Sequence, residues 1–374
     1  MPNEDLLSLS DAAREIRQIC EQRHHERRPR PFFFVVGAGT SFPTVPLAWM
    51  MAMECRATAL VNGVSPARVD LPAKEKYSYW FSRAFPQPEQ RQNYLEKLMD
   101  HRLYSSAVLA LANLLGAEHN TIGNVVVTPN FDTMVSGALR LLGHREPLVC
   151  GQPASALLVD PACSRVQIIH VHGTYLSYDC CNLGAEMRRQ ERAVVPVLTG
   201  LLTHSAPLVI GYSGWDDPIM TALHRRLKGR LPCNLYWFCH CREDYERLKP
   251  WLRRHPDCRF VLPTQFSTLE GRDVLRALAR ATGVPITDEH MSQADRTDPC
   301  LASSEMNELD ERLRVTDTGA EIVRAIVNFE SKASTTVVRS AINRLLRADY
   351  DQASQADRDW PSGREGSWCF EDTD

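Results

Sequence analysis

Phe32-Phe33-Phe34-Val35-Val36-Gly37-Ala38-Gly39-Thr40-Ser41 is a run of five apolar residues that leads into a turn with two glycines. A continuous apolar run of this length is typical of a strand buried on both faces, as in a parallel sheet. The same signature recurs at residues 125–127, 166–169, 208–210, 235–238 and 260–262. Segments with helical periodicity lie between most of these runs, at residues 131–142, 184–203, 215–228, 243–254 and 267–282. The alternation predicts an α/β fold with a doubly wound parallel, Rossmann-like sheet.

The spacing of the strands also predicts the domain organisation. About 90 residues separate the first strand from the strand at Val125, which is too long for a crossover, so we expect a helical insertion subdomain at about residues 48–120. Residues 1–285 then form the main domain. Residues 286–348 are expected to hold a polar linker and a C-terminal helical extension. The acidic segment 349–374 is expected to be disordered.

Composition excludes several classes of protein. The chain has 374 residues, 44% of them hydrophobic and 24% charged, with a net charge of −3. These values exclude global disorder and a coiled-coil rod, and they imply no direct binding of nucleic acid. No stretch approaches the roughly 18 apolar residues of a membrane span. The polar, acidic beginning is not a secretory signal, so we expect a cytoplasmic protein.

The twelve cysteines point to free thiols rather than to a disulfide framework or a metal site. They include no Cys-x-x-Cys pair. Cys239 and Cys241 flank His240, but ligands one residue apart are too close for an ordinary zinc ribbon. We therefore expect no bound metal.

The first motif that could carry chemistry is Gly37-Ala38-Gly39-Thr40-Ser41, directly after the first strand. Its glycines allow a tight turn and close approach of a phosphate, and the hydroxyls that follow can add donors. Phe42 replaces the third glycine of the full dinucleotide fingerprint. A tight turn without a ligand explains this motif equally well.

The second motif, Thr128-Pro129-Asn130-Phe131-Asp132, closes the strand at Val125. Pro129 helps to end the strand. Asn130 and Asp132 then lie at the carboxyl end of a parallel strand, where open α/β sheets bind ligands. The alternative is that both residues only cap the next helix.

The other two motifs also follow predicted strands. His170 and His172 lie two residues apart, and His172 stands at the strand end before Gly173, where a histidine can move a proton near neutral pH. A purely structural histidine is the alternative. The last motif, Gly211-Tyr212-Ser213-Gly214-Trp215-Asp216-Asp217-Pro218, is a glycine-rich turn in which either aspartate can cap the following helix. Because all four motifs end parallel strands, we expect them to converge on one crevice.

GAGTS, TPNFD, HVHGT and GYSGWD, in this order, resemble the sirtuin-like superfamily, and more closely the bacterial sirtuin-like NAD-hydrolysing domains of antiphage defence systems. The resemblance covers about residues 30–265. It implies a Rossmann-type NAD-binding domain with a small helical domain.

The resemblance also implies a role for each matching residue. Asn130 would hold the nicotinamide ribose and the attacking nucleophile, His172 would be the catalytic histidine, and Asp132 would lie near the nicotinamide carboxamide. Asn234, which opens the strand at Leu235, would reach the adenine-side ribose. The residues expected to bind the dinucleotide phosphates are Gly37, Ala38, Gly39, Thr40, Ser41, Gly211 and Ser213.

Two departures from the protein deacylases of this superfamily favour hydrolysis. The chain has no zinc ribbon of paired Cys-x-x-Cys motifs, and residues 42–47 read Phe-Pro-Thr-Val-Pro-Leu where deacylases carry Asp-Phe-Arg. Both departures argue against a groove for acyl-lysine. We therefore expect an NAD glycohydrolase that converts NAD to nicotinamide and ADP-ribose and uses NAD as its substrate.

The resemblance extends this expectation to an antiphage effector that halts an infected cell by depleting NAD. Such an enzyme needs gating, which we expect from homo-oligomer assembly or from a partner such as a HerA-like ATPase. The segment 305–348 is the candidate assembly surface, or else it covers the main domain. The alternatives are an NAD-dependent protein deacylase or ADP-ribosyltransferase, and a non-catalytic module that senses NAD or ADP-ribose.

Overall fold

A computed structural model describes residues 6–42, 44–64, 73–99, 104–160, 163–176, 184–264 and 268–286 of the protein. The expected linker, C-terminal helical extension and acidic segment lie outside these residues.

The core of the described chain is one eight-stranded sheet in which every pair of neighbouring strands is parallel. The spatial order is β1-β8-β7-β6-β2-β3-β5-β4. The strands are β1 (Leu6–Leu7), β2 (Phe32–Val36), β3 (Val125–Thr128), β4 (Leu148–Cys150), β5 (Gln167–His170), β6 (Ala206–Ile210), β7 (Leu235–Phe238) and β8 (Cys258–Val261). The fold prediction is confirmed. The edge strands β1 and β4 were not anticipated, because two or three residues give no periodicity.

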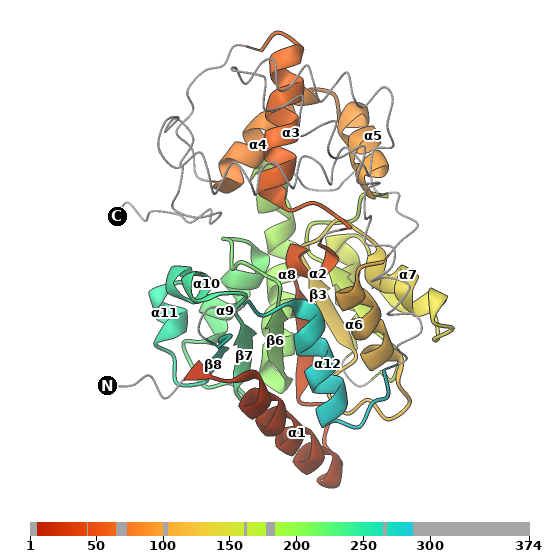
Figure 1. The fold of residues 1–374 in the computed structure, drawn as a ribbon, viewed down its shortest axis with the longest axis vertical. Coiled ribbons are helices and arrows are strands. Elements are labelled where there is room, and N and C mark those ends of the chain that lie inside the picture. The colour runs from red at the N-terminus through yellow and green to blue at the C-terminus, as the bar shows by residue number, and fades with distance from the viewer. Residues whose placement is uncertain are drawn as a thin grey trace.

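The strands are apolar because helices cover both faces of the sheet (Figure 1). All five residues of β2 are buried. α12 packs against α1 and α6, and α6 packs against α7, whereas α8 packs against α9. The helices of these two layers are α1 (Leu9–His25), α6 (Ser106–Gly116), α7 (Met134–Leu141), α8 (Gly184–His204), α9 (Pro218–Arg226) and α12 (Gly271–Ala281), and the short elements are α2 (Ala38–Ser41), η1 (Pro153–Leu158), α10 (Arg242–Arg247) and α11 (Pro250–Arg253).

A helical insertion separates β2 from β3. It contains α3 (Ala48–Val61), α4 (Ala73–Ala84) and α5 (Pro88–Met99), which stand apart from the sheet in Figure 1. The Tyr94 ring of α5 stacks on Phe85, just after α4, and meets Phe81 of α4 at a tilt, and the Tyr94 hydroxyl donates to Glu54 of α3 at 3.0 Å. α6, by contrast, packs in the layer of α7 and α12. The separate part of the insertion therefore ends near Met99 rather than near residue 120.

None of the helices in the described residues is long and apolar enough to span a membrane.

Candidate functional site

The strand order places a topological switch point between β2 and β6. From β2 the chain proceeds to β3 and β5 on one side of the sheet, and then crosses to β6, β7 and β8 on the other. Strand order reverses at this point, so the loops after β2 and β6 diverge and leave a crevice between them. Open α/β sheets bind ligands in such a crevice, at the carboxyl ends of the strands.

Main-chain contact locks the two glycine loops together at this switch point. The amides of Gly37 and Gly39 donate to the carbonyls of Ile210 and Gly211, both at 3.0 Å. A Cβ added at Gly37 would lie 2.3 Å from the Gly211 oxygen, and Gly211 itself adopts a φ of +62°. Glycine is thus required at Gly37 for close approach of the backbone and at Gly211 for its left-handed conformation.

The donors of the first glycine loop make hydrogen bonds within the protein. The amides of Gly37, Gly39 and Thr40 are already donated to main-chain carbonyls, and the Thr40 hydroxyl donates to the Gly37 carbonyl at 2.7 Å. These donors are therefore engaged within the protein, and the phosphate contact expected of this loop stays a prediction. They hold the turn in a shape that lets a ligand approach.

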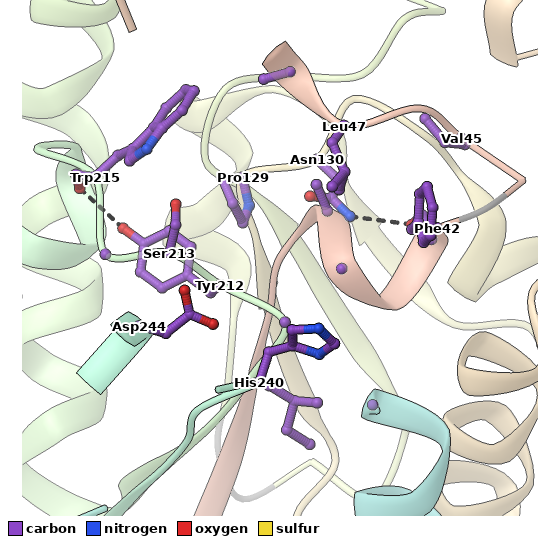
Figure 2. Close-up of a pocket in the computed structure, with 18 of the residues that line it drawn as sticks. Phe42, Val45, Leu47, Pro129, Asn130, Tyr212, Ser213, Trp215, His240 and Asp244 are labelled. Carbon is purple, nitrogen blue, oxygen red and sulfur yellow. Dashed lines mark hydrogen bonds between the residues drawn. The ribbon is translucent and has the colours of Figure 1, made fainter. Parts of the chain in front are cut away.

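One cavity of about 580 Å³ opens over the carboxyl ends of the strands. All four sequence motifs contribute to its wall, so the expected convergence is found. Figure 2 shows Asn130, Tyr212 and Ser213 around it. The predicted site residues that line the cavity are Ala38, Gly39, Ser41, Asn130, Asp132, His172, Gly211 and Ser213.

A chain of hydrogen bonds orients the Asn130 amide. Its Nδ2 donates to the Ser41 hydroxyl at 3.2 Å, and this hydroxyl donates to Asp132 Oδ2 at 2.8 Å. The other oxygen of Asp132 accepts from the amide of Met134, the first residue of α7, at 3.1 Å. Because Nδ2 is held by Ser41, the carbonyl oxygen Oδ1 is the end of the amide left to accept from a ligand.

His170, the last residue of β5, holds the main chain of Asn130 through a hydrogen bond. It is 2% exposed, and its Nδ1 lies 3.0 Å from the Asn130 carbonyl oxygen. Burial lowers the pKa of His170, against the opposing effects of this hydrogen bond and of Asp132. The neutral ring therefore donates its Nδ1 hydrogen to the carbonyl, and His170 serves the site without facing the cavity.

The lowered pKa of His170 predicts destabilisation in acid. Below about pH 6.5 the unfolded histidine binds a proton that the folded one still refuses, so the free energy of unfolding falls by up to about 1.4 kcal/mol per pH unit. Urea unfolding at pH 7.5 and 5.5 measures this effect. His170→Asn keeps an N–H donor without a titrating ring. The free energy of unfolding of this variant should therefore fall less between pH 7.5 and 5.5. Some fall should remain, because burial also lowers the pKa of His144. An equal fall in both proteins would contradict the assignment.

His172 lies just beyond β5 and faces Asp217, which comes from the loop after β6. Its Nε2 is 3.9 Å from Asp217 Oδ2, and the two side chains are 9% and 3% exposed. Its Nδ1 is buried and has no hydrogen-bond partner among the described residues. Asp217 is thus the acidic side chain that the fold places against this imidazole. The sequence had marked Asp217 only as a possible helix cap.

The opposite end of the cavity is charged. His240 and Asp244 lie there, away from Asn130 (Figure 2). His240 faces Glu270 at 3.8 Å, and Arg247 pairs with Asp244 at 3.3 Å. The sequence analysis missed these residues as a group because they come from three places: the loop after β7, α10 and the N-cap of α12. Their position after the strand at Leu235 was the signal that could have found them.

Asn234 does not belong to this end of the site. It precedes β7, whereas the cavity is lined by Phe238 at the carboxyl end of that strand. At about 3.3 Å per residue, some 13 Å of strand separates the two positions. The structure therefore does not bring Asn234 together with the other predicted site residues, and its contact with a ribose stays an untested prediction.

The helical insertion supplies an apolar wall beside Asn130. Met50 and Met51 of α3, Tyr77 of α4 and Met99 of α5 all line the cavity. Methionine side chains adapt their shape to a planar or irregular group. The insertion therefore gives part of the cavity an apolar lining.

No protein-family model matches the chain, and a search of curated proteins found no match either. Within the described residues, no group of three or more His, Cys, Asp or Glu side chains is arranged to hold a metal ion.

Proposed function

We propose that the protein is an NAD glycohydrolase of the sirtuin-like kind, which converts NAD to nicotinamide and ADP-ribose. The observation that carries the proposal is the common cavity of Asn130 and His172 at the switch point of a Rossmann-like sheet. A dinucleotide laid across the switch would put its nicotinamide ribose between these two residues. Its diphosphate would pass the two glycine loops, and its adenosine would reach His240 and Asp244.

The reaction requires little proton transfer, but it requires the water and the ribose to be positioned accurately. The pyridinium leaving group departs as neutral nicotinamide, so it needs no acid. The site must instead hold a water against the anomeric carbon and stabilise positive charge on the ribose. The orientation of Asn130 leaves its Oδ1 to accept from a ribose hydroxyl or the water, and His172 lines the same space.

The test is direct. Purified full-length protein is incubated with NAD, at low concentration and at concentrations that favour assembly, and the products are separated by chromatography. Nicotinamide and ADP-ribose in equal amounts support the proposal. NAD recovered intact in every assembled state overturns it. Size-exclusion chromatography with light scattering on the same samples tests the accompanying proposal that homo-oligomer assembly gates the activity, and added HerA-like ATPase tests gating by a partner.

The charged end of the cavity predicts a preference for NAD over NADP. A phosphate on the adenosine ribose would meet Asp244 and Glu270, while Arg247 is already engaged by Asp244 and Lys249 by Asp216 at 3.5 Å. Like charges brought together at a binding site oppose binding. We expect kcat/KM for NADP to be at least about tenfold lower, equivalent to about 1.4 kcal/mol.

Steady-state rates with both substrates check this preference. Asp244→Asn removes one carboxylate and releases Arg247. The variant should therefore raise kcat/KM for NADP relative to that for NAD. Equal rates with NAD and NADP in the unaltered protein would contradict the placement of adenosine at this end.

The apolar wall of the insertion gives a second candidate some support. Met50, Met51 and Met99 line the same cavity as Asn130 and could accommodate an acyl chain, as an NAD-dependent deacylase would require. Nicotinamide release that depends strictly on an added acyl-lysine peptide would favour deacylation over hydrolysis.

A further inference from the structure

The carboxylate of Asp217 is placed for more than the helix cap it provides. Its Oδ1 accepts from the amides of Ile219 at 2.8 Å and Met220 at 3.1 Å, and these two bonds complete the N-terminal cap of α9. Capping requires only one side-chain oxygen. The same bonds prevent the carboxylate from rotating, and they leave Oδ2 directed at His172.

The separation between Asp217 Oδ2 and His172 Nε2 fits a shared ligand atom. At 3.9 Å the two atoms are too far apart for a direct hydrogen bond. A single oxygen about 2.8 Å from each could accept from Nε2–H and donate to Oδ2. Both residues line the cavity, so an oxygen from a ligand or a water can enter this gap.

The surroundings keep the pair dry and the carboxylate strongly interacting. The Asp217 side chain is 3% exposed, and the Tyr212 hydroxyl lies close enough to interact with its carboxylate. Burial, together with the charge of Asp217, holds the pKa of Tyr212 well above its usual range, so this hydroxyl remains protonated next to the carboxylate. Charge interactions in such a water-poor site are stronger than at a protein surface.

We propose that Asp217 is a second catalytic residue, which accepts the proton of the attacking water while His172 Nε2–H holds the same oxygen. In this step the water oxygen forms the bond to the anomeric carbon, and the ribose–nicotinamide bond breaks with its electron pair on the nicotinamide nitrogen. The water proton passes to Asp217 Oδ2 and then to solvent. The inference rests on the proposed NAD hydrolysis.

Asp217→Asn is the decisive variant, because asparagine retains the capping oxygen but is a far poorer proton acceptor. We expect kcat to fall by about 10²–10⁴-fold, the usual range for general-base catalysis, and KM to change by less than about threefold. The matched control is Asp216→Asn. Its side chain is 63% exposed, pairs with Lys249 and does not line the cavity, so its kcat should stay at the unaltered value.

A second variant separates catalysis from capping. Asp217→Ser keeps a capping hydroxyl but leaves space where the carboxylate was, so added formate should restore its kcat at least about tenfold. Formate should leave Asp216→Asn unchanged. Thermal unfolding of each variant shows whether α9 remains capped.

The outcomes distinguish the two proposals. If the unaltered protein hydrolyses NAD and Asp217→Asn does so at the same kcat, the role of Asp217 is overturned while the proposed function stands. An Asp217→Ser variant that folds but gains nothing from formate also overturns it. If the unaltered protein releases no nicotinamide in any assembled state, the proposed function fails and the catalytic role of Asp217 fails with it.

Discussion

For the proposed NAD hydrolysis, we expect the replacement of Asn130 with alanine to lower kcat by about 10²–10³-fold, with little change in the stability of the fold. The variant removes the amide that Ser41 and Asp132 hold in one orientation, and with it the oxygen that faces the cavity. Loss of one preorganised polar group at a reacting centre has this order of effect on kcat. The measurement is nicotinamide release under saturating NAD, with thermal unfolding recorded on the same sample.

Asn62→Ala is the matched control for this substitution. Asn62 is an exposed asparagine just after α3 and does not line the cavity, so its variant should retain full activity. Retention of the unaltered rate by Asn130→Ala would remove Asn130 from the reaction. The Asn130→Ala substitution itself should leave the fold unaltered, because Ser41 and Asp132 would still bond to each other.

Replacing Gly37 with alanine disrupts the switch point itself. Gly37 has a φ of −99°, which alanine tolerates, so the effect comes from contact alone. The new Cβ would lie 2.3 Å from the Gly211 oxygen and 2.6 Å from the Tyr212 Cα, both of which are backbone atoms. The two loops must separate, at a cost of about 1–3 kcal/mol for overpacking. We expect a lower melting temperature and loss of NAD turnover.

Gly200→Ala controls for the loss of a glycine. Gly200 lies within α8, and nothing stands within 4 Å of an added Cβ. Alanine is favoured over glycine in a helix by about 1 kcal/mol, so this variant should be slightly more stable and fully active. A Gly37→Ala protein with the stability and activity of the unaltered chain would show that the loops can part without consequence.

Local pattern was sufficient to predict most of the fold. Strands such as β2 and β6 are apolar throughout because both faces are buried, and this leaves a clear signal in the sequence. The turn residues after them marked the carboxyl ends of the strands correctly. Asn234 differs from these residues, because it precedes β7 and lies at the opposite end of that strand from the cavity.

The sequence by itself determined the parallel α/β sheet, the helical insertion and the four motifs that converge over the sheet, because strand periodicity and turn chemistry are local properties of the chain. Only the tertiary structure decided which polar groups of these motifs remain available to a ligand. The amides of Gly37 and Gly39 donate to the last residue of β6 and the first residue after it. The Ser41 hydroxyl bonds to Asn130 and Asp132, and Asp217 both caps α9 and faces His172. Each of these outcomes depends on contacts between segments about 45 to 175 residues apart, and hydrogen bonds between such distant segments leave no periodic trace in the sequence.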